Sequence, residues 1–519
     1  MARQNTYGKR AKKSQAARLF AELPQSPLRK PQIEPASHDV EDLTSEFAKV
    51  HIEQTPQKLK SPLRNLDSKR FSDFNATLRS FVEEAKLNSP APKRCLGAEI
   101  YTDSAEDSIL SNHGDVEDND NSENITVHDY EESLRILTWD DVCPAEDRIE
   151  KIAEASSAEV YRITNDHGTS IIKVVRLDSP IKAQTKTQVL SKLIDEQPHP
   201  VGDLDGELQI SQWLADIPGF VIYKEQYIVQ GKTTKKLLET HQKFQRKLKR
   251  QDPGRAQFYP SPSRYLDETK FLVVELGDAG TALEDWKSNT ESQLWDIFFL
   301  VAIALARAED LAMFEHRDLH EGNLCIRSIS KERKRSIRSD GPYYGYSGLD
   351  ITILDYGLSR AEDLEIDYAK PIFCDLEKDL SLFTSTHAHQ CEVYRQMRSF
   401  LLRADRTCLP PDAHKTPYAR GMNGTLSWDV YAPYTNVLWL AYLYKYLTDK
   451  FQGDDNDLAN FQEKTKELWM YLDSNAAEDT PCFGSAAEVV CFAVEAGWIS
   501  EAQLASSGTS ILQQDETSL

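Results

Sequence analysis

Three polar side chains near the middle of the chain have the types and spacing that phosphoryl transfer requires. The octad His316–Asn323 reads His-Arg-Asp-Leu-His-Glu-Gly-Asn, and Asp-Tyr-Gly follows at Asp355–Gly357 after a short apolar segment. Transfer of a phosphoryl group needs a carboxylate at the attacking hydroxyl and oxygen ligands for Mg²⁺. In this interpretation Asp318 supplies the carboxylate, and the Asn323 amide and the Asp355 carboxylate supply the metal ligands.

The order of these motifs is typical of protein kinases, in which H-R-D-L-x-x-x-N precedes a metal-binding D-F-G turn. A lone His-Arg-Asp is common by chance in 519 residues, whereas the complete octad with a downstream Asp-Tyr-Gly is not. The upstream segment Ser170–Val175 resembles the V-A-I-K strand of kinases, so we expect Lys173 to contact the α- and β-phosphates of ATP. Glu207, at the start of a predicted helix, is the expected partner of Lys173, with Asp203 and Asp205 as alternatives.

The segment that should cover the nucleotide phosphates has alanine where kinases have glycine. Ala153, Ala155 and Ala158 stand at the three glycine places of G-x-G-x-x-G. Alanine is costly where φ is positive, and its Cβ limits how closely backbone N–H groups approach a phosphate. We therefore expect weaker ATP binding or a stiffer site, and an inactive kinase fold stays an alternative. The nucleotide contacts expected in this segment are Ile152, Ala153, Glu154, Ala155 and Val160.

Hydrophobic periodicity predicts a strand-rich part followed by a helical part. Strands are expected near residues 149–152, 159–163, 170–177 and 270–276, with a hairpin turn at 166–168; helices are expected at 207–214, 294–314, 434–447 and 458–472. The segment that links the two parts should meet the adenine ring of ATP through its backbone. The expected contacts there are Glu275, Leu276, Gly277 and Ala279.

These patterns predict an α+β fold of the bilobal protein-kinase type, with a small β-rich N-lobe and a larger helical C-lobe. Residues 1–135 are rich in Ser, Pro, Gln and charged side chains, and we expect a disordered regulatory or targeting tail. The N-lobe is expected at residues 136–280, with a polar, basic insertion near 233–264. The C-lobe is expected at residues 281–508, and residues 509–519 are expected to fray. The basic cluster Lys9–Lys13 suits a nuclear import signal.

Composition excludes several classes of protein. The chain has 61 basic and 83 acidic side chains, a net charge of −22, which argues against sequence-specific nucleic-acid binding and fits basic partners. The longest apolar run, Ile297–Ala306, is short against the ~20 residues that a membrane helix needs, so no membrane contact is expected. The eight cysteines are scattered without a C-x-x-C pair, so neither a zinc site nor a disulfide framework is expected.

Over about residues 137–505 the sequence resembles the haspin family of atypical serine/threonine protein kinases, in a fungal-like form. The residues that carry the resemblance are His320 and Gly322 of the octad, Asp355–Arg360, Phe373–Asp375, Asp379, Leu382–Phe383 and Tyr431–Leu440. The block Tyr431–Leu440 is similar to the haspin helix that replaces the usual segment after D-F-G. No Ala-Pro-Glu motif follows Gly357, which agrees with that replacement.

The resemblance implies a kinase that uses ATP and Mg²⁺ to phosphorylate the N-terminal tail of histone H3, at the threonine in its third position, in mitotic chromatin. It implies acidic side chains that bind the basic tail, at the positions Glu154, Glu284, Asp375 and Asp379 of this chain. Ser381 stands where the family has a further aspartate. It also implies that no activation-loop phosphorylation is needed. We expect a nuclear, chromosome-associated monomer with a cytoplasmic pool.

Two other functions remain open. Small-molecule phosphotransferases share H-x-D-L-H-x-G-N loops, which His320 and Gly322 match, but they usually have glycine at the place of Arg317 and lack the block Tyr431–Leu440. A chromatin scaffold with an inactive kinase fold would explain the alanines of the phosphate loop. Lys173, Asp318 and Asp355 argue against such a scaffold, because all three side chains needed for transfer are present.

Overall fold

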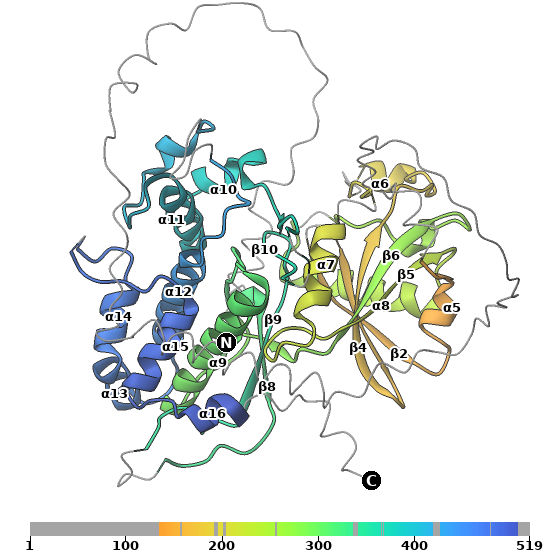
Figure 1. Cartoon of the computed structure of the whole chain (residues 1–519). Coiled ribbons are helices and arrows are strands. Elements are labelled where there is room, and N and C mark those ends of the chain that lie inside the picture. The colour runs from red at the N-terminus through yellow and green to blue at the C-terminus, as the bar shows by residue number, and fades with distance from the viewer. Residues whose placement is uncertain are drawn as a thin grey trace, which may run out of the picture.

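The protein is described by a computed structural model of two lobes, which lie side by side in Figure 1. The described residues are 134–506, except for 156–157, 191–195, 201–203, 255–256, 336–340, 365, 367, 419–425 and 478. The tail predicted at residues 1–135 and the predicted frayed C-terminus therefore lie almost wholly outside the described residues. The bilobal α+β architecture confirms the fold class expected from the sequence.

A six-stranded sheet of order β1-β5-β6-β4-β3-β2 forms the N-lobe. Its strands are β1 (Ile136–Leu137), β2 (Arg148–Glu154), β3 (Glu159–Asn165), β4 (Gly168–Arg176), β5 (Tyr223–Gln230) and β6 (Lys270–Gly277). The predicted hairpin turn joins β3 to β4, where Asn165 pairs with Gly168 and the glycine takes a φ of 123°. Such a φ favours glycine, because a Cβ would be strained there.

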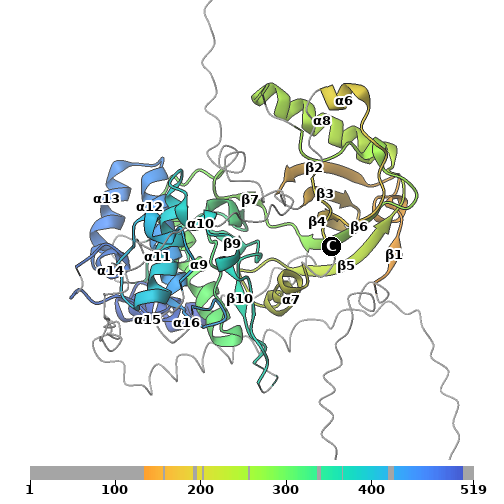
Figure 2. The same ribbon diagram turned by 90° about the horizontal axis from the view of Figure 1, so that it is seen from above.

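Helices cover both faces of this sheet. They are α5 (Trp139–Val142), α6 (Lys186–Leu190), α7 (Asp205–Leu214) and α8 (Lys235–Gln251). Because successive side chains of a strand point to opposite faces, Val174 of β4 packs in one core cluster with α5 and α8, and Val175 packs in another with α7. Helix α8 lies within the predicted insertion, is capped by the Thr234 hydroxyl and runs along β2 (Figure 2). The insertion is therefore an integral part of the N-lobe.

The C-lobe is built from helices around α9, with short strands facing the N-lobe. The helices are α9 (Glu291–Ala312), α10 (Ser381–Thr384), α11 (His389–Arg403), α12 (Tyr434–Lys450), α13 (Asp455–Lys464), α14 (Lys466–Leu472), α15 (Ala486–Glu495) and α16 (Glu501–Ser506). The strands are β7 (Thr281–Ala282), β8 (Leu324–Ser328), β9 (Leu349–Ile353), β10 (Arg360–Ala361) and β11 (Ile372–Phe373). β7, β8 and β9 form one antiparallel sheet, and β10 pairs with β11.

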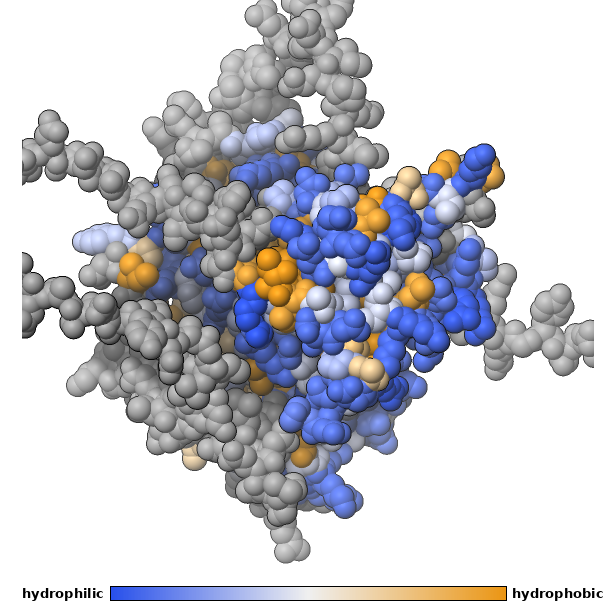
Figure 3. Space-filling view, turned by 90° about the vertical axis from the view of Figure 1, so that its right-hand side faces the viewer, coloured by the Kyte–Doolittle hydropathy of each residue, from blue (hydrophilic) through white to orange (hydrophobic). Residues whose placement is uncertain are grey.

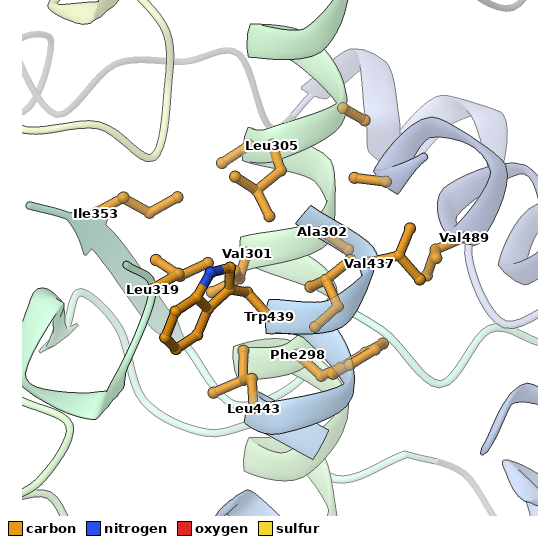
Figure 4. Close-up of a cluster of buried hydrophobic side chains, with 14 of the residues drawn as sticks. Phe298, Val301, Ala302, Leu305, Leu319, Ile353, Val437, Trp439, Leu443 and Val489 are labelled. Atoms are coloured by element: carbon orange, nitrogen blue, oxygen red, sulfur yellow. The ribbon is translucent and has the colours of Figure 1, made fainter. Parts of the chain in front are cut away.

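The C-lobe core reaches directly to the predicted catalytic residues. In the cluster of Figure 4, side chains of α9 meet those of α12 and α15, and Leu319 and Ile353 join them. Leu319 follows Asp318 in the chain, and Ile353 ends the strand before Asp355. Each such buried aliphatic side chain contributes roughly 1.5–3 kcal/mol to stability. The core therefore holds the backbone beside both predicted catalytic carboxylates.

One predicted helix is divided in the structure. The sequence predicts a single helix at 458–472, but α13 ends at Lys464 and α14 begins at Lys466. The fully buried Thr465 between them donates its hydroxyl to the Phe461 carbonyl at 2.6 Å and contacts the Tyr444 hydroxyl at 2.7 Å. A threonine that bonds back to the carbonyl four residues earlier bends a helix.

One face of the N-lobe is seen to be mainly hydrophilic in Figure 3. Figure 3 looks onto the side of the molecule that lies at the right of Figure 1, and blue, polar residues predominate there with scattered apolar ones. Among the helices of the described ranges, none combines the length and the apolar character that crossing a membrane requires.

Candidate active site

The Asp318 carboxylate is held by two side chains from different elements. The Tyr394 hydroxyl of α11 donates to Oδ1, and Asn323 Nδ2 lies 3.4 Å from Oδ2. Nδ2 of Asn323 also donates to the Asp318 carbonyl at 2.8 Å, which closes the loop between them. Burial raises the pKa of Asp318 to about 6, although the neighbouring His320 and the Tyr394 hydrogen bond lower it. At neutral pH Asp318 is therefore ionised and able to accept a proton.

His316 connects the catalytic loop to the end of β9. Its side chain is fully buried, and burial lowers its pKa to about 4, so the ring is neutral at pH 7. Nδ1 accepts from the Asp318 backbone N–H at 3.2 Å, which leaves Nε2 to donate to the Leu354 carbonyl at 3.0 Å. The neutral imidazole thus fixes the spacing between Asp318 and Asp355, and it braces the loop without reaching a substrate.

Lys173 forms the ion pair that the sequence predicts. Its Nζ lies 2.5 Å from Glu207 Oε1, and both side chains are mostly buried. Burial opposes the charge of Lys173, but the carboxylates of Glu207 and Asp355 outweigh it and raise its pKa above the ordinary value. Lys173 in turn outweighs the burial of Asp355 and lowers the pKa of that carboxyl. Of the alternative partners, Asp203 lies outside the described residues, and Lys173 pairs with Glu207 rather than with Asp205.

Asn323 and Asp355 offer oxygen atoms that suit Mg²⁺. Because Asn323 Nδ2 donates to Asp318, its amide oxygen is the atom left for a metal. The Leu354 N–H donates to the Asn323 carbonyl at 2.9 Å. Asp355 is the next residue in the chain, so this backbone hydrogen bond keeps it close to Asn323. In the described ranges no group of three or more His, Cys, Asp or Glu side chains could hold a metal. The two residues therefore fit an ion that completes its oxygen shell with nucleotide phosphates and water.

The block Tyr431–Leu440 supports the catalytic loop from the C-lobe through Glu315. This fully buried carboxylate accepts hydrogen bonds from the Ala432 backbone N–H at 2.7 Å and from the Thr435 hydroxyl at 2.8 Å. It also pairs with Arg317 Nε at 3.1 Å. Arg317 is fully buried and has a φ of 63°, a conformation that an arginine keeps only where its surroundings enforce it.

Asn436, in the same block, makes a second set of buried contacts. Its Oδ1 accepts from the His316 backbone N–H at 3.0 Å, and its Nδ2 donates to the Phe314 carbonyl and to Glu309 Oε1, each at 2.9 Å. These hydrogen bonds hold the backbone between the end of α9 and the start of the octad in place. The block Tyr431–Leu440 therefore positions the catalytic loop.

The alanine-rich phosphate loop forms without the backbone conformation that would demand glycine. None of Ala153, Ala155 and Ala158 has a positive φ. Ala155 N donates to the Ala158 carbonyl at 2.8 Å, and the Tyr259 hydroxyl donates to the Ala155 carbonyl at 2.8 Å. Alanine therefore causes no backbone strain at these three positions. Ile152 flanks the loop, and Val160 pairs with Ala153 on one side and Lys173 on the other.

The Glu154 carboxylate, expected to bind the basic peptide, has partners within the N-lobe. Its carboxylate lies 2.8 Å from Lys151 Nζ and accepts from Gln245 Nε2 of α8 at 2.6 Å, and 5% of the side chain is exposed. The structure therefore holds Glu154 within the N-lobe rather than at a peptide-binding surface. The cause is α8, which brings Gln245 beside β2 from 91 residues away in the sequence.

The link between the lobes has the path that the sequence predicts. Leu276 packs against core clusters of both lobes, and Ala279 is almost fully buried. The Gly277 N–H donates to the Ile222 carbonyl at 2.8 Å, so this N–H is not available to an adenine ring. The Glu275 carboxylate accepts from the Ser170 hydroxyl at 2.6 Å. That carboxylate is therefore engaged within the sheet.

The other three predicted substrate acids differ in their surroundings. Glu284 is half-buried, its Oε2 has no hydrogen-bond partner among the described residues, and burial raises its pKa, with Asp285 and Glu321 adding to the effect. Asp375 accepts from the Glu377 backbone N–H and caps a short 3₁₀ turn, a structural role. Asp379 is exposed and accepts from the Ser381 backbone N–H at 2.9 Å.

Sequence reasoning missed Tyr394 and the buried cluster beneath the phosphate loop. In that cluster Lys151 is fully enclosed and contacts Glu159 and His241 as well as Glu154. No motif marks these residues. The only signal was indirect: Lys151 stands two residues after the apolar Ile149 in a predicted strand, and so on the same face.

Comparisons with known proteins agree with this geometry. A family model described as haspin like kinase domain matches residues 43–488. The serine/threonine-protein kinase haspin of Mus musculus is 28% identical over 314 residues, which is 59% of this chain and 35% of that protein. The haspin homolog of Drosophila melanogaster is 26% identical over 334 residues, 61% of this chain and 52% of that protein.

The haspin homolog hrk1 of Schizosaccharomyces pombe is 26% identical over 344 residues, 61% of this chain and 60% of that protein. The chain thus spans between about a third and three-fifths of the length of these relatives. All three bear the name of serine/threonine-protein kinase. Because the family model matches most of its length, the chain belongs to the haspin-like kinase family.

Proposed function

We propose that this protein is an ATP-dependent serine/threonine kinase that phosphorylates the N-terminal tail of histone H3, at the threonine in its third position, in mitotic chromatin. One observation carries the proposal. Asp318 is ionised at neutral pH and held by Tyr394 and Asn323, next to the charged group of Lys173, Glu207 and Asp355. These are the parts that direct phosphoryl transfer to a hydroxyl requires.

In the proposed mechanism the threonine hydroxyl attacks the γ-phosphorus of ATP. The new P–O bond forms while the bond from the γ-phosphorus to the bridging oxygen of ADP breaks, and Asp318 accepts the hydroxyl proton. Lys173, kept charged by Glu207, binds the α- and β-phosphates. Asn323 and Asp355 would hold Mg²⁺, which neutralises phosphate charge when bound. Positioning and charge neutralisation, rather than a covalent intermediate, lower the barrier.

A basic peptide is the substrate that the charges favour. The chain has a net charge of −22, Asp379 is exposed, and half-buried Glu284 has a buried carboxylate oxygen, Oε2, without a hydrogen-bond partner among the described residues. Opposite charge on the peptide would give specificity and fast encounter. A lysine or arginine near the Glu284 oxygen would supply its missing hydrogen bond. Because the resemblance to the haspin family implies a chromatin substrate, we further propose a nuclear, chromosome-associated monomer with a cytoplasmic pool.

Two alternative functions have less support. A small-molecule phosphotransferase would usually have glycine at Arg317, whereas here that side chain is buried between Glu315 and the Trp428 ring, 5.2 Å away. An inactive scaffold would gain nothing from the ion pair of Lys173 and Glu207 beside Asp355. That pair argues for nucleotide chemistry.

The test is radiolabel transfer from ATP with Mg²⁺ to an unmodified N-terminal H3 peptide. Lys173→Met should abolish labelling, and Lys224→Met, a matched change in the same sheet on β5 at a more exposed side chain, should not. A peptide with alanine in the third position should stay unlabelled. ATP turnover without peptide labelling would contradict the proposed substrate, and absence of both in folded protein would favour the scaffold.

A further inference from the structure

A groove with basic walls lies between β2 and α8, beside the phosphate loop. It has a volume of about 540 Å³. Its basic lining residues are Lys151, Arg162, Lys243, Arg246, Lys247 and Arg250, and Glu150 is its acidic one. Figure 2 shows α8 lying over β2, the edge strand of the N-lobe sheet.

The cations that α8 contributes lie on one face and lack carboxylate partners. Lys243, Arg246, Lys247 and Arg250 have the spacing i, i+3, i+4 and i+7, which places them on one side of a helix. All four side chains are exposed, and none is within ion-pair distance of a carboxylate of the described residues. Like charges at this spacing repel and destabilise a helix. An anion in the groove would relieve this repulsion.

The other basic residues near the groove are already paired. Lys151 contacts Glu154 and Glu159, and Arg162 lies 3.7 Å from Asp278. The unpaired positive charge of the groove therefore comes from the stripe on α8, by which we mean Lys243, Arg246, Lys247 and Arg250. A ligand that fits it has several negative charges in a row and is extended, because the stripe covers two turns of helix.

We infer that this groove binds residues 101–132 of the same chain. That segment contains eleven acidic side chains and no lysine or arginine. It ends just before Leu134, where the described N-lobe begins, and β1 lies at the opposite edge of the sheet from β2. Five strand spacings are about 24 Å, and 32 residues can extend over roughly 100 Å. The segment can therefore reach α8 from its attachment point.

Tethering and net charge favour this ligand over a separate polyanion. A tethered segment meets its site at an effective concentration of the order of millimolar. A free nucleic acid would instead be repelled by the net charge of −22. The bound segment would lie against Lys151 and Ile152, next to the α8 contacts that hold Glu154. It thus gives the N-terminal region a direct physical route to the phosphate loop.

The test uses the full chain and a zero-length carbodiimide cross-linker, with an equal mixture of isotopically light and heavy protein. Cross-links are expected between acids of residues 101–132 and Lys243 or Lys247, within one chain. The variant Arg246→Gln/Arg250→Gln keeps both reactive lysines but should lower their yield several-fold, as should 0.5 M salt, since exposed ion pairs are screened. The matched control Lys287→Gln/Lys331→Gln removes two exposed lysines elsewhere and should leave the yield unchanged.

Hydrogen exchange gives a second readout that does not depend on kinase activity. If the segment is bound nine-tenths of the time, local opening of α8 should be about tenfold slower than in a chain whose eleven acids are changed to Asn and Gln. Equal exchange in the two chains would overturn the inference. Cross-links between heavy and light chains would instead assign the groove to a second copy. Protection that appears only with added DNA, with or without the acids, would assign it to nucleic acid.

Discussion

Tyr394 offers a sharp test of how the site controls its proton acceptor. Tyr394→Phe removes the hydroxyl that donates to Asp318 Oδ1 and keeps the ring, which stacks edge-on against Trp439. Because this hydrogen bond favours the carboxylate, its loss should raise the pKa of Asp318 from its present value of about 6. A hydrogen bond to a charged group contributes about 1.5–3 kcal/mol, and about 1.4 kcal/mol corresponds to one pKa unit.

Water can replace part of this bond, because 18% of the Asp318 side chain is exposed. We therefore take the lower end of the range and expect a rise of about one unit, to about 7. The variant should then lose roughly twofold in kcat/KM at pH 7 and about tenfold below pH 5.5, and match the parent above pH 8.5. Only the ionised carboxylate accepts the proton, so a higher pKa moves the acidic limb of the kcat/KM profile to higher pH.

The assay is initial-rate phosphorylation of the H3 peptide between about pH 5 and 9, since the profile of kcat/KM reports groups of the free enzyme. Tyr442→Phe is the matched control, because that hydroxyl bonds Glu321 Oε2 of the same loop at 2.5 Å and should leave the acidic limb in place. A loss that is equal at every pH would refute the electrostatic reasoning. A faster variant would mean that the Tyr394 hydroxyl occupies the site of the substrate hydroxyl.

Three further predictions concern the catalytic base and the buried network. Asp318→Asn should lower the phosphorylation rate by roughly 10²–10⁴ while nucleotide binding, measured by calorimetry, stays near that of the parent; wild-type turnover would refute its role. Asn436→Ala leaves buried groups of His316 and Phe314 without partners, at about 1–3 kcal/mol each, and should lower the urea midpoint; an unchanged midpoint would contradict the contacts. Burial opposes the charge of Glu159, but Lys151 and His241 outweigh it and lower its pKa to about 2, so stability should fall by about 3 kcal/mol as pH drops from 4.5 towards 2. Glu159→Gln should be less stable at pH 7 and show a flatter profile, measured by denaturant titration; a profile parallel to that of the parent would be the contrary result.

Much of this site could be predicted from the sequence because its motifs are local. The octad and the Asp-Tyr-Gly turn each lie on one loop, so their spacing alone predicts which carboxylate and amide groups reach the site. The pairing of Lys173 with Glu207 was also predictable, since a buried lysine on a strand needs a carboxylate. The conformation of the alanine loop could not be predicted. The φ angles of Ala153 and Ala155 depend on neighbours in the folded structure that the sequence does not identify.

Sequence reasoning is least informative where distant segments meet. Glu154 looked free for a peptide until α8 brought Gln245 beside it. Tyr394 reaches Asp318 across 76 residues, from a helix that carries no motif. The predicted helix at 458–472 is divided because Thr465 finds a buried partner in Tyr444, which belongs to another helix. In each case periodicity and motif spacing give no information about the tertiary contact.

The contacts behind the octad have a consequence for how this protein can be regulated. The backbone N–H of His316 donates a hydrogen bond to Asn436, and the carboxylate of Glu315 accepts one from Thr435. The side chains of Asn436 and Thr435 are completely buried in the C-lobe. Such bonds break only when the surrounding core opens, so we expect the backbone amides of the octad to exchange slowly, together with that core. A loop with that stability has no separate inactive conformation of comparable energy to populate. We therefore expect control of this protein to act elsewhere than on the shape of its catalytic loop, for example through what occupies the surface of the molecule.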